Sequence, residues 1–244
     1  MTTFLTSSPT GPLGVPCDVP GLDNSNGFVE LVRRYWPHNA RCLMIAAFPE
    51  NHAQNDQMTW FYSEAVKNAE LGFACFDLWD GRTPQLSREE LHAYDVIFTA
   101  GGHVPTQRKF FEDIRLRELL AGYEGLLIGT SAGSMNAAVT VYGWPEEPGE
   151  SLDPNHELFF PGLGLARTIV LPHYQLMKQA WLDGKRLFED ITFSHSFGQK
   201  FYAIPDGSFV LVEGGKETLY GESWLIRDGK MEKFSEYGEK KDLL

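Results

Sequence analysis

The sequence is poor in cysteine and in basic residues, and it contains no long hydrophobic run. Its three cysteines are Cys17, Cys42 and Cys75, an odd number without metal-ligand spacing. We therefore expect reduced thiols, with Cys42 and Cys75 in the core, and neither a disulfide framework nor a metal site. Lys and Arg total 21 against 33 Asp and Glu, which gives a net charge of −12. This excess of acid argues against nucleic acid or an anionic membrane as a partner.

No stretch of the 244 residues approaches the roughly 18 apolar residues that a membrane span requires. Residues 1–14 contain neither a basic residue nor a long apolar run, so no signal peptide is expected. These absences predict a cytoplasmic protein. A hydrophobic fraction of 43% is typical of a globular fold, and an aromatic fraction of 13% would permit a buried homodimer face.

Short apolar runs alternate with segments of helical spacing in the first half of the chain. The apolar runs cover residues 3–7, 42–47, 74–78, 96–100 and 126–129, and the helical segments cover 27–35, 56–71, 87–93 and 106–120. Ser87 with Glu90 forms a capping-box pattern. Continuous apolar runs are typical of strands buried on both faces of a parallel sheet. We therefore predict one α/β domain over residues 1–244, with a doubly wound, mostly parallel sheet flanked by helices.

The pattern changes after residue 139. Residues 143–164 are rich in Gly, Pro and acids and predict a long loop, which in a compact domain usually has a function. A strand at 168–171 and a helix near 175–189 follow, and then strand-like runs at 201–204, 209–213 and 224–227. Asp206-Gly207 and Asp228-Gly229 resemble hairpin turns, so we expect a small antiparallel addition at the C-terminal end.

The chemistry points to one segment, Gly129-Thr-Ser-Ala-Gly133, which lies between a predicted strand and a predicted helix. This is the G-x-S-x-G pattern of a nucleophile elbow, in which a tight turn exposes the serine at the carboxyl end of a sheet. Only glycine leaves room beside so strained a residue. The pattern predicts Ser131 as a nucleophile.

A nucleophilic serine needs a base and a carboxylate that orients it. His173 directly follows a predicted strand and is the preferred base, whereas His103 also follows a strand and is a second candidate. Three glutamates of the long loop between Ser131 and His173 are candidates for the acid, and the residues alone do not rank them: Glu146, Glu147 and Glu150. The backbone N–H of Ala132 would be one oxyanion donor, and the bare backbone of Gly101-Gly102 could supply the second.

Three motifs in order resemble the peptidase E and cyanophycinase family of serine peptidases. They are Thr99-Ala-Gly-Gly, Ile128-Gly-Thr-Ser-Ala-Gly-Ser and Leu171-Pro-His-Tyr. The resemblance implies a fold similar to that of class I glutamine amidotransferases. It also implies Ser131 as nucleophile and His173 as base, with Gly102 and Ala132 as the oxyanion hole. Counting along the family pattern places the acid nearest Glu150, with Glu147 next.

The same resemblance implies a small peptide substrate cleaved at aspartyl residues, as by an Asp-X dipeptidase. A substrate carboxylate would then need a basic partner. Arg186, beside Lys185 on the predicted helix after His173, is the first candidate, and Arg108 is another. No cofactor or metal is required by serine chemistry of this kind, and no H-E-x-x-H or C-x-x-C spacing occurs.

Two other functions remain open. An α/β-hydrolase esterase would share the G-x-S-x-G motif, but such enzymes carry their histidine near the end of the chain, whereas more than 70 residues follow His173 here. A peptide-binding homologue without turnover is the second alternative, although nothing obvious is missing from the expected machinery.

Overall fold

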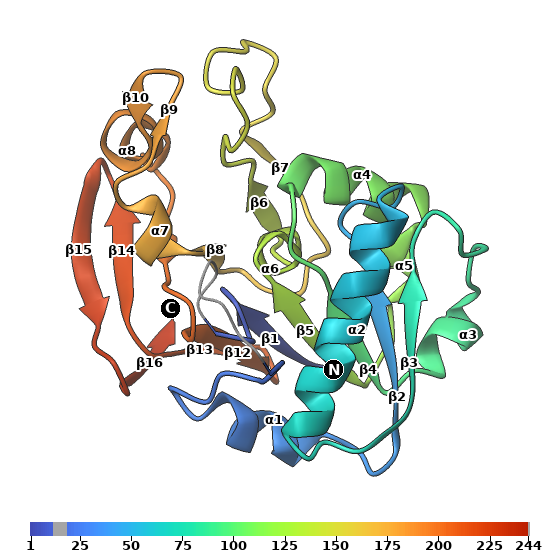
Figure 1. The fold of residues 1–244 in the computed structure, drawn as a ribbon. Helices are drawn as coiled ribbons and strands as arrows, with labels where there is room; N and C mark the ends of the chain where they lie inside the picture. The colour runs from blue at the N-terminus through green and yellow to red at the C-terminus, as the bar shows by residue number, and fades with distance from the viewer. Residues whose placement is uncertain (12–18, 244) are drawn as a thin grey trace.

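The computed structural model describes residues 1–11 and 19–243, so Cys17 lies outside the described residues. Figure 1 shows the course of the chain. The helices are α1 (Phe28–Tyr35), α2 (His52–Asn68), α3 (Arg88–His92), α4 (Val104–Asp113), α5 (Leu116–Leu119), α6 (Ala132–Asn136), α7 (Tyr174–Met177), the π-helix η1 (Leu187–Thr192) and α8 (Phe193–His195). The strands are β1 (Thr2–Thr6), β2 (Ala40–Ile45), β3 (Phe73–Trp79), β4 (Val96–Thr99), β5 (Leu126–Thr130), β6 (Thr140–Tyr142), β7 (Phe159–Pro161), β8 (Ile169–Leu171), β9 (Trp181–Leu182), β10 (Lys185–Arg186), β11 (Phe201–Ala203), β12 (Phe209–Glu213), β13 (Lys216–Tyr220), β14 (Ser223–Arg227), β15 (Lys230–Ser235) and β16 (Lys240–Leu243).

The main sheet has the strand order β16-β13-β12-β1-β5-β4-β2-β3. Strands β1, β5, β4, β2 and β3 run parallel, as the apolar runs predict, and β12, β13 and β16 extend the sheet in antiparallel fashion. Parallel strands end at one edge of a sheet, which therefore collects the residues after Thr6, Ile45, Thr99 and Thr130. In open α/β sheets this carboxyl edge is where ligands bind.

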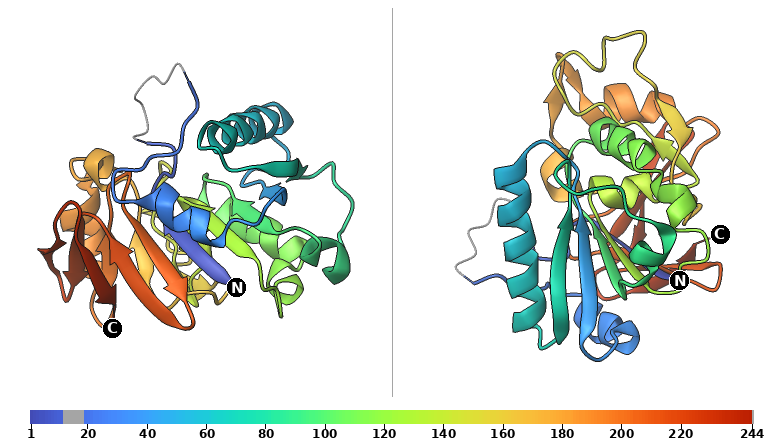
Figure 2. Two further views of the ribbon diagram at one scale, coloured as in Figure 1. Left: turned by 90° about the horizontal axis from the view of Figure 1, so that it is seen from below. Right: turned by 90° about the vertical axis from the view of Figure 1, so that its right-hand side faces the viewer.

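Helices cover both faces of the main sheet, so the doubly wound α/β prediction is confirmed. On one face α1 and α2 pack through Phe28, Val32, Tyr62 and Val66. On the other face α3, α4 and α5 pack on alternate residues of the same strands. The right-hand view of Figure 2 shows α2 and the green helices α4 and α5 on opposite sides of the strands. This alternation follows from the two-residue period of a strand.

A second sheet, of order β15-β14-β11-β8, lies beside the main one, at the left of Figure 1. Strand β8 pairs parallel with β11, whereas β14 and β15 are antiparallel. The predicted Asp228-Gly229 turn is confirmed, because it joins β14 to β15 and both residues have positive φ, as a two-residue type I′ hairpin requires. A hydrophobic cluster that includes Leu5, Val170 and Phe201 fills the space between the two sheets.

Two predictions for the second half of the chain are wrong. The helix expected near 175–189 ends at Met177, and a hairpin of β9 and β10 follows. Its turn residues, Asp183 and Gly184, both have positive φ, which a helix cannot accommodate. Asp206-Gly207 is not a hairpin turn either, because β11 and β12 belong to different sheets.

Two smaller findings complete the fold. Cys42 is buried in the core and free, whereas Cys75 is also free but only half-buried, because it lies on the edge strand β3. Within residues 1–11 and 19–243, no helix combines the length and the hydropathy needed to cross a bilayer.

Candidate active site

Ser131 occupies a sharp turn between β5 and α6, at the carboxyl edge of the main sheet. Its φ of 48° and ψ of −113° lie outside the favoured regions for a residue with a side chain. This turn is hydrogen-bonded to the end of β1, because the Ser131 N–H donates to the carbonyls of Thr6 and Ser7 at 3.1 Å each. Such strain at a serine between strand and helix is the geometry of a nucleophile elbow.

The two glycines of the motif are required by space. A methyl group at Gly133 would lie 2.3 Å from the carbonyl oxygen of Thr99, and one at Gly129 would lie 2.9 Å from the Ser134 nitrogen. Helix α6 therefore approaches β4 as closely as it does only because Gly133 lacks a side chain, and it approaches β5 as closely as it does only because Gly129 lacks one. This confirms the expectation that only glycine fits on either side of Ser131.

His173 lies across a shared cavity from the main sheet. It follows β8 through Pro172 and has left-handed backbone angles, φ 57° and ψ 32°. Strand β8 belongs to the second sheet, whereas Ser131 follows β5 of the main sheet, so the two residues come from separate sheets. They nevertheless line one cavity.

A buried carboxylate that the sequence reading did not identify, that of Asp206, contacts His173. Its Oδ1 lies 2.7 Å from His173 Nδ1, and the Asp206 side chain is 1% exposed. The strand preceding each residue explains the contact, because β8 and β11 are paired in parallel with Leu171 opposite Ala203. An Nδ1–H bond to a carboxylate fixes the tautomer in which Nε2 is free to accept a proton.

Two further side chains hold this pair in place. The hydroxyl of Ser7 donates to Asp206 Oδ1 at 2.6 Å and accepts the backbone N–H of His173 at 2.7 Å. Gln175 forms two bonds to Asp206, donating from Nε2 to Oδ2 at 2.6 Å and accepting the Asp206 N–H at 3.0 Å. Both oxygens of Asp206 are thus hydrogen-bonded, as a buried carboxylate requires.

Glu150 does not lie against His173. Its Oε1 lies 2.9 Å from Nε2 of His103, and its Oε2 accepts the N–H groups of Glu146 and Glu147. Burial alone would raise the pKa of Glu150, but these N–H donors and the His103 ring outweigh it and hold the pKa below its usual range. The expected triad acid is therefore part of the long loop's own hydrogen-bond network, tied to the start of α4.

The other candidates from the sequence are also placed. The second possible base, His103, bonds to Glu150 and, through Nδ1, to Thr106 at 2.8 Å. Glu147 is exposed. Glu146 is half-buried, and burial together with repulsion from Glu150 and Glu147 raises its pKa to about 8.

The two expected oxyanion donors lie on either side of Ser131. Ala132 is the first residue of α6, where a backbone N–H has no partner inside the helix. Gly101 and Gly102 line the same cavity as Ser131, and a methyl group at Gly101 would be 3.3 Å from Ser131 Cβ. A methyl group at Gly102 would collide with Ala47, at 2.6 Å. The glycine loop thus fits closely between Ser131 and Ala47, which follows β2.

We call the cavity at this edge the Ser131 cavity. It has a volume of about 430 Å³, within the range of small-molecule sites. It is lined by Ser8, Thr10, Gln54, Gln57, Met58, Phe61, Tyr62, Gly101, Gly102, Thr130, Ser131 and His173. No hydrogen bond joins the Ser131 hydroxyl to His173 in the described part of the chain, a contact that often forms only when substrate is bound.

The two arginines expected to bind a substrate carboxylate lie elsewhere. Arg186 belongs to the β9–β10 hairpin, where its guanidinium forms two bonds to Asp190 at 2.7 and 3.0 Å. Arg108 is on α4, where it bonds to Glu112 and Glu157 and stacks on Phe160. Neither residue lines the Ser131 cavity.

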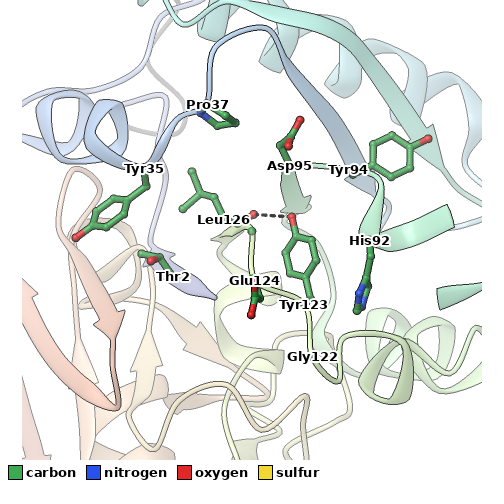
Figure 3. A pocket seen from close by; sticks show the side chains of 11 residues that line it. Thr2, Tyr35, Pro37, His92, Tyr94, Asp95, Gly122, Tyr123, Glu124 and Leu126 are labelled. Atoms are coloured by element: carbon green, nitrogen blue, oxygen red, sulfur yellow. Dashed lines mark hydrogen bonds between the residues drawn. The ribbon is translucent and has the colours of Figure 1, made fainter. Parts of the chain in front are cut away.

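A second cavity of about 440 Å³ lies at the opposite edge of the main sheet, where the parallel strands begin. Figure 3 shows the side chains that surround it, including Thr2, Asp95 and Leu126 at or next to the starts of β1, β4 and β5. Several of its polar groups are bonded to the protein itself: Asp95 accepts the Arg41 N–H, and His92 Nε2 lies 2.9 Å from the Leu119 carbonyl. Such partnered groups give no recognition chemistry comparable to that of the carboxyl edge.

The described residues contain no group of three or more His, Cys, Asp or Glu side chains that could hold a metal ion. The site is instead made of hydroxyl, imidazole, carboxylate and backbone N–H groups.

Comparison with solved structures shows the same fold in two peptidases. A peptidase from an acI-B1 Actinobacterium has a TM-score of 0.59 at 14% identity, over 99% of this chain and 96% of its own. A putative peptidase E protein from Listeria monocytogenes EGD-e has a TM-score of 0.55 at 16% identity, over 96% of this chain and 98% of its own.

No match to a curated protein was found by sequence. The model of peptidase family S51, however, matches residues 53–220, which is more than half of the chain and includes Ser131, His173 and Asp206. The motifs of the sequence, the shared fold and this match agree, and the chain belongs to peptidase family S51.

Proposed function

We propose that this chain is a serine peptidase that hydrolyses short peptides through an acyl-enzyme, with Ser131, His173 and Asp206 as its triad. The observation that carries the proposal is the arrangement of Ser131 and His173. Ser131, with its strained backbone, lines the same cavity as His173. The Nδ1 atom of His173 lies 2.7 Å from Oδ1 of Asp206, whose side chain is 1% exposed. In this proposal Asp206, and not the expected Glu150, is the carboxylate of the triad.

In the proposed first half-reaction, His173 Nε2 takes the proton of the Ser131 hydroxyl as Oγ attacks the peptide carbonyl carbon. The carbonyl oxygen becomes negative and accepts hydrogen bonds from the N–H groups of Gly102 and Ala132. Asp206 stabilises the imidazolium that forms. The tetrahedral intermediate then breaks its C–N bond, and His173 gives its proton to the leaving amine.

In the second half-reaction, His173 takes a proton from water as the water oxygen attacks the ester carbon of the acylated Ser131. The new tetrahedral intermediate releases a carboxylic acid, and His173 returns the proton to the Ser131 oxygen. Every proton is accounted for by His173, so no metal or organic cofactor enters the scheme.

The order of the triad along the chain separates this proposal from an α/β-hydrolase esterase. In that fold the order is serine, acid, histidine, whereas Asp206 follows His173 here. A non-catalytic homologue is disfavoured by the complete set of groups around the cavity. The preference for aspartyl dipeptides rests on the family resemblance alone, because its expected cation, Arg186, is engaged by Asp190.

The test is active-site labelling combined with hydrolysis. A fluorophosphonate probe is expected to modify wild-type protein at Ser131, located by peptide mass spectrometry, and to leave Ser131→Ala unmodified. In parallel, dipeptides Asp-Xaa, β-Asp-Xaa, Glu-Xaa and Ala-Xaa and their tripeptide extensions report chain length and bond type. Folded protein that neither reacts with the probe nor hydrolyses any peptide would refute the proposal.

A further inference from the structure

One face of helix α2 forms a wall of the Ser131 cavity. Gln54, Gln57, Met58, Phe61 and Tyr62 line it at spacings of three and four residues, which place them on a single helical face. Met58 and Phe61 are half-buried and pack against the core beneath the helix, and Tyr62 is buried with its hydroxyl 3.0 Å from that of Thr130. This wall is uncharged, and its deeper part is apolar.

A buried negative charge lies next to the cavity. Asp206 lies behind His173, which itself lines the cavity. The negative charge of Asp206 also affects Tyr62 of this wall. Burial and, in smaller part, the Asp206 carboxylate raise the pKa of Tyr62 to about 12. A substrate carboxylate entering the cavity would therefore lose its hydration and face a like charge.

Three arginines outside the cavity are each bonded to acids that do not line it. Arg186 is bonded to Asp190, and Arg108 to Glu112 and Glu157. Arg82, close to α2, bridges Asp80 and Asp56. The lining residues include no Lys or Arg within the described chain, and residues 12–18, PLGVPCD, contain none in their sequence.

From this arrangement we infer that the Ser131 cavity selects an uncharged, largely apolar side chain, such as Leu, Met or Phe, next to the scissile bond and rejects Asp or Glu there. The inference rests on the proposed peptidase function. Apolar side chains gain from burial against Met58 and Phe61, and the amides of Gln54 and Gln57 leave room for a Gln side chain as well. Asp and Glu find no Lys or Arg among the described lining residues to offset the hydration that they lose.

The experiment compares tetrapeptides Ala-Xaa-Ala-Ala with Xaa as Leu, Met, Phe, Gln, Asp or Glu, and products are identified by liquid chromatography and mass spectrometry. Because each product is identified, the result holds whichever bond beside Xaa is cut. We expect kcat/KM for Leu, Met and Phe to exceed that for Asp by about 100-fold, the scale on which a pocket discriminates side chains.

A charge placed on the wall tests the cause of this preference. Gln57→Arg puts a guanidinium at an exposed helical position that lines the cavity, and it should raise kcat/KM for Asp relative to Leu by about tenfold. Trp60→Arg is the matched control, because Trp60 is on the same helix and 58% exposed but is not among the lining residues. It should keep the wild-type Leu-to-Asp ratio.

The outcomes separate this inference from the proposed function. The inference is supported when the wild type prefers Leu, Met or Phe over Asp and this preference becomes smaller in Gln57→Arg but not in Trp60→Arg. Fastest cleavage at Asp, with Ser131 still labelled by fluorophosphonate, would overturn the inference and leave the peptidase proposal standing. Absence of both labelling and hydrolysis would overturn the proposed function and the inference with it.

Discussion

His173 and Asp206 each follow a proline at the end of one of two paired parallel strands, and their side chains meet with 2.7 Å between Nδ1 and Oδ1. The matching segments are Ile169-Val-Leu-Pro-His173 and Tyr202-Ala-Ile-Pro-Asp206. Strand pairing continues past the strands, since the Ile204 N–H donates to the Leu171 carbonyl at 2.9 Å. The small second sheet therefore presents the base and its carboxylate together to Ser131 on the main sheet.

Asp206→Asn should lower kcat by about 10³–10⁴-fold, because the amide favours the wrong imidazole tautomer and cannot stabilise the cation. Glu150→Gln is the matched control, since it alters another carboxylate that is hydrogen-bonded to a histidine, His103. It should change kcat less than about tenfold. Steady-state kinetics on one peptide decide between the two acids, and an equal loss in both variants would contradict the assignment of Asp206.

Much of the main sheet follows from sequence alone. Continuous apolar runs predicted β1 to β5: both faces of β1, β2, β4 and β5 are largely buried, whereas the edge strand β3 is mostly half-buried. The Ser87 capping box is present at α3 as expected. The elbow at Ser131 was also predictable, because the G-x-S-x-G pattern occupies five consecutive residues between a strand and a helix. Such features depend on a few neighbouring residues.

Asp206 was missed because its role depends on pairing between strands that are distant in sequence. An Asp-Gly pair after a strand is a hairpin signal, and at Asp228-Gly229 that interpretation was right. At Asp206-Gly207 the chain instead crosses between sheets. The repeated strand–proline–polar pattern at His173 and Asp206 was the available signal, and Asp183-Gly184 likewise marked the hairpin that replaced the predicted helix.

Ser7→Ala should reduce kcat by about 10- to 100-fold, the range typical of groups that orient a reactive histidine from behind. The variant removes a donor to Asp206 and leaves the His173 N–H without its acceptor. Ser134→Ala is the control, since Ser134 is also buried and donates to the Thr6 carbonyl without touching His173. Both variants should lose a similar amount of thermal stability, and an equal loss of kcat would show that Ser7 acts only through stability.

Gly133→Ala should destabilise the protein by about 3 kcal/mol or prevent folding, because the added carbon would lie 2.3 Å from the Thr99 carbonyl oxygen. Gly72→Ala is the control, since nothing lies within 4 Å of a methyl group at that position. Its free energy of unfolding should change by less than about 0.5 kcal/mol. Urea denaturation measures both, and a Gly133→Ala protein as stable as Gly72→Ala would contradict the close approach of β4 and α6.

The ionisation of Glu146 should lower the free energy of unfolding of the protein as pH rises from about 4.5 to about 8. Burial and the neighbouring Glu150 and Glu147 raise its pKa from 4.5 to about 8, so the folded state keeps a proton that the unfolded state releases. The stabilising contribution is therefore complete below the unfolded pKa and is lost as pH passes the folded pKa.

Glu146→Gln removes this titration. At pH 5 the variant and the wild type should have nearly equal Tm values, because Glu146 is then neutral in the folded protein. At pH 9 the variant should be more stable by on the order of 1 kcal/mol, or about 2–4 °C in Tm for a chain of this size. Glu147→Gln, at the neighbouring exposed position, is the matched control. The Tm difference between Glu146→Gln and the wild type could instead stay constant from pH 5 to pH 9. That result would mean that Glu146 is ionised throughout this range and would contradict its raised pKa.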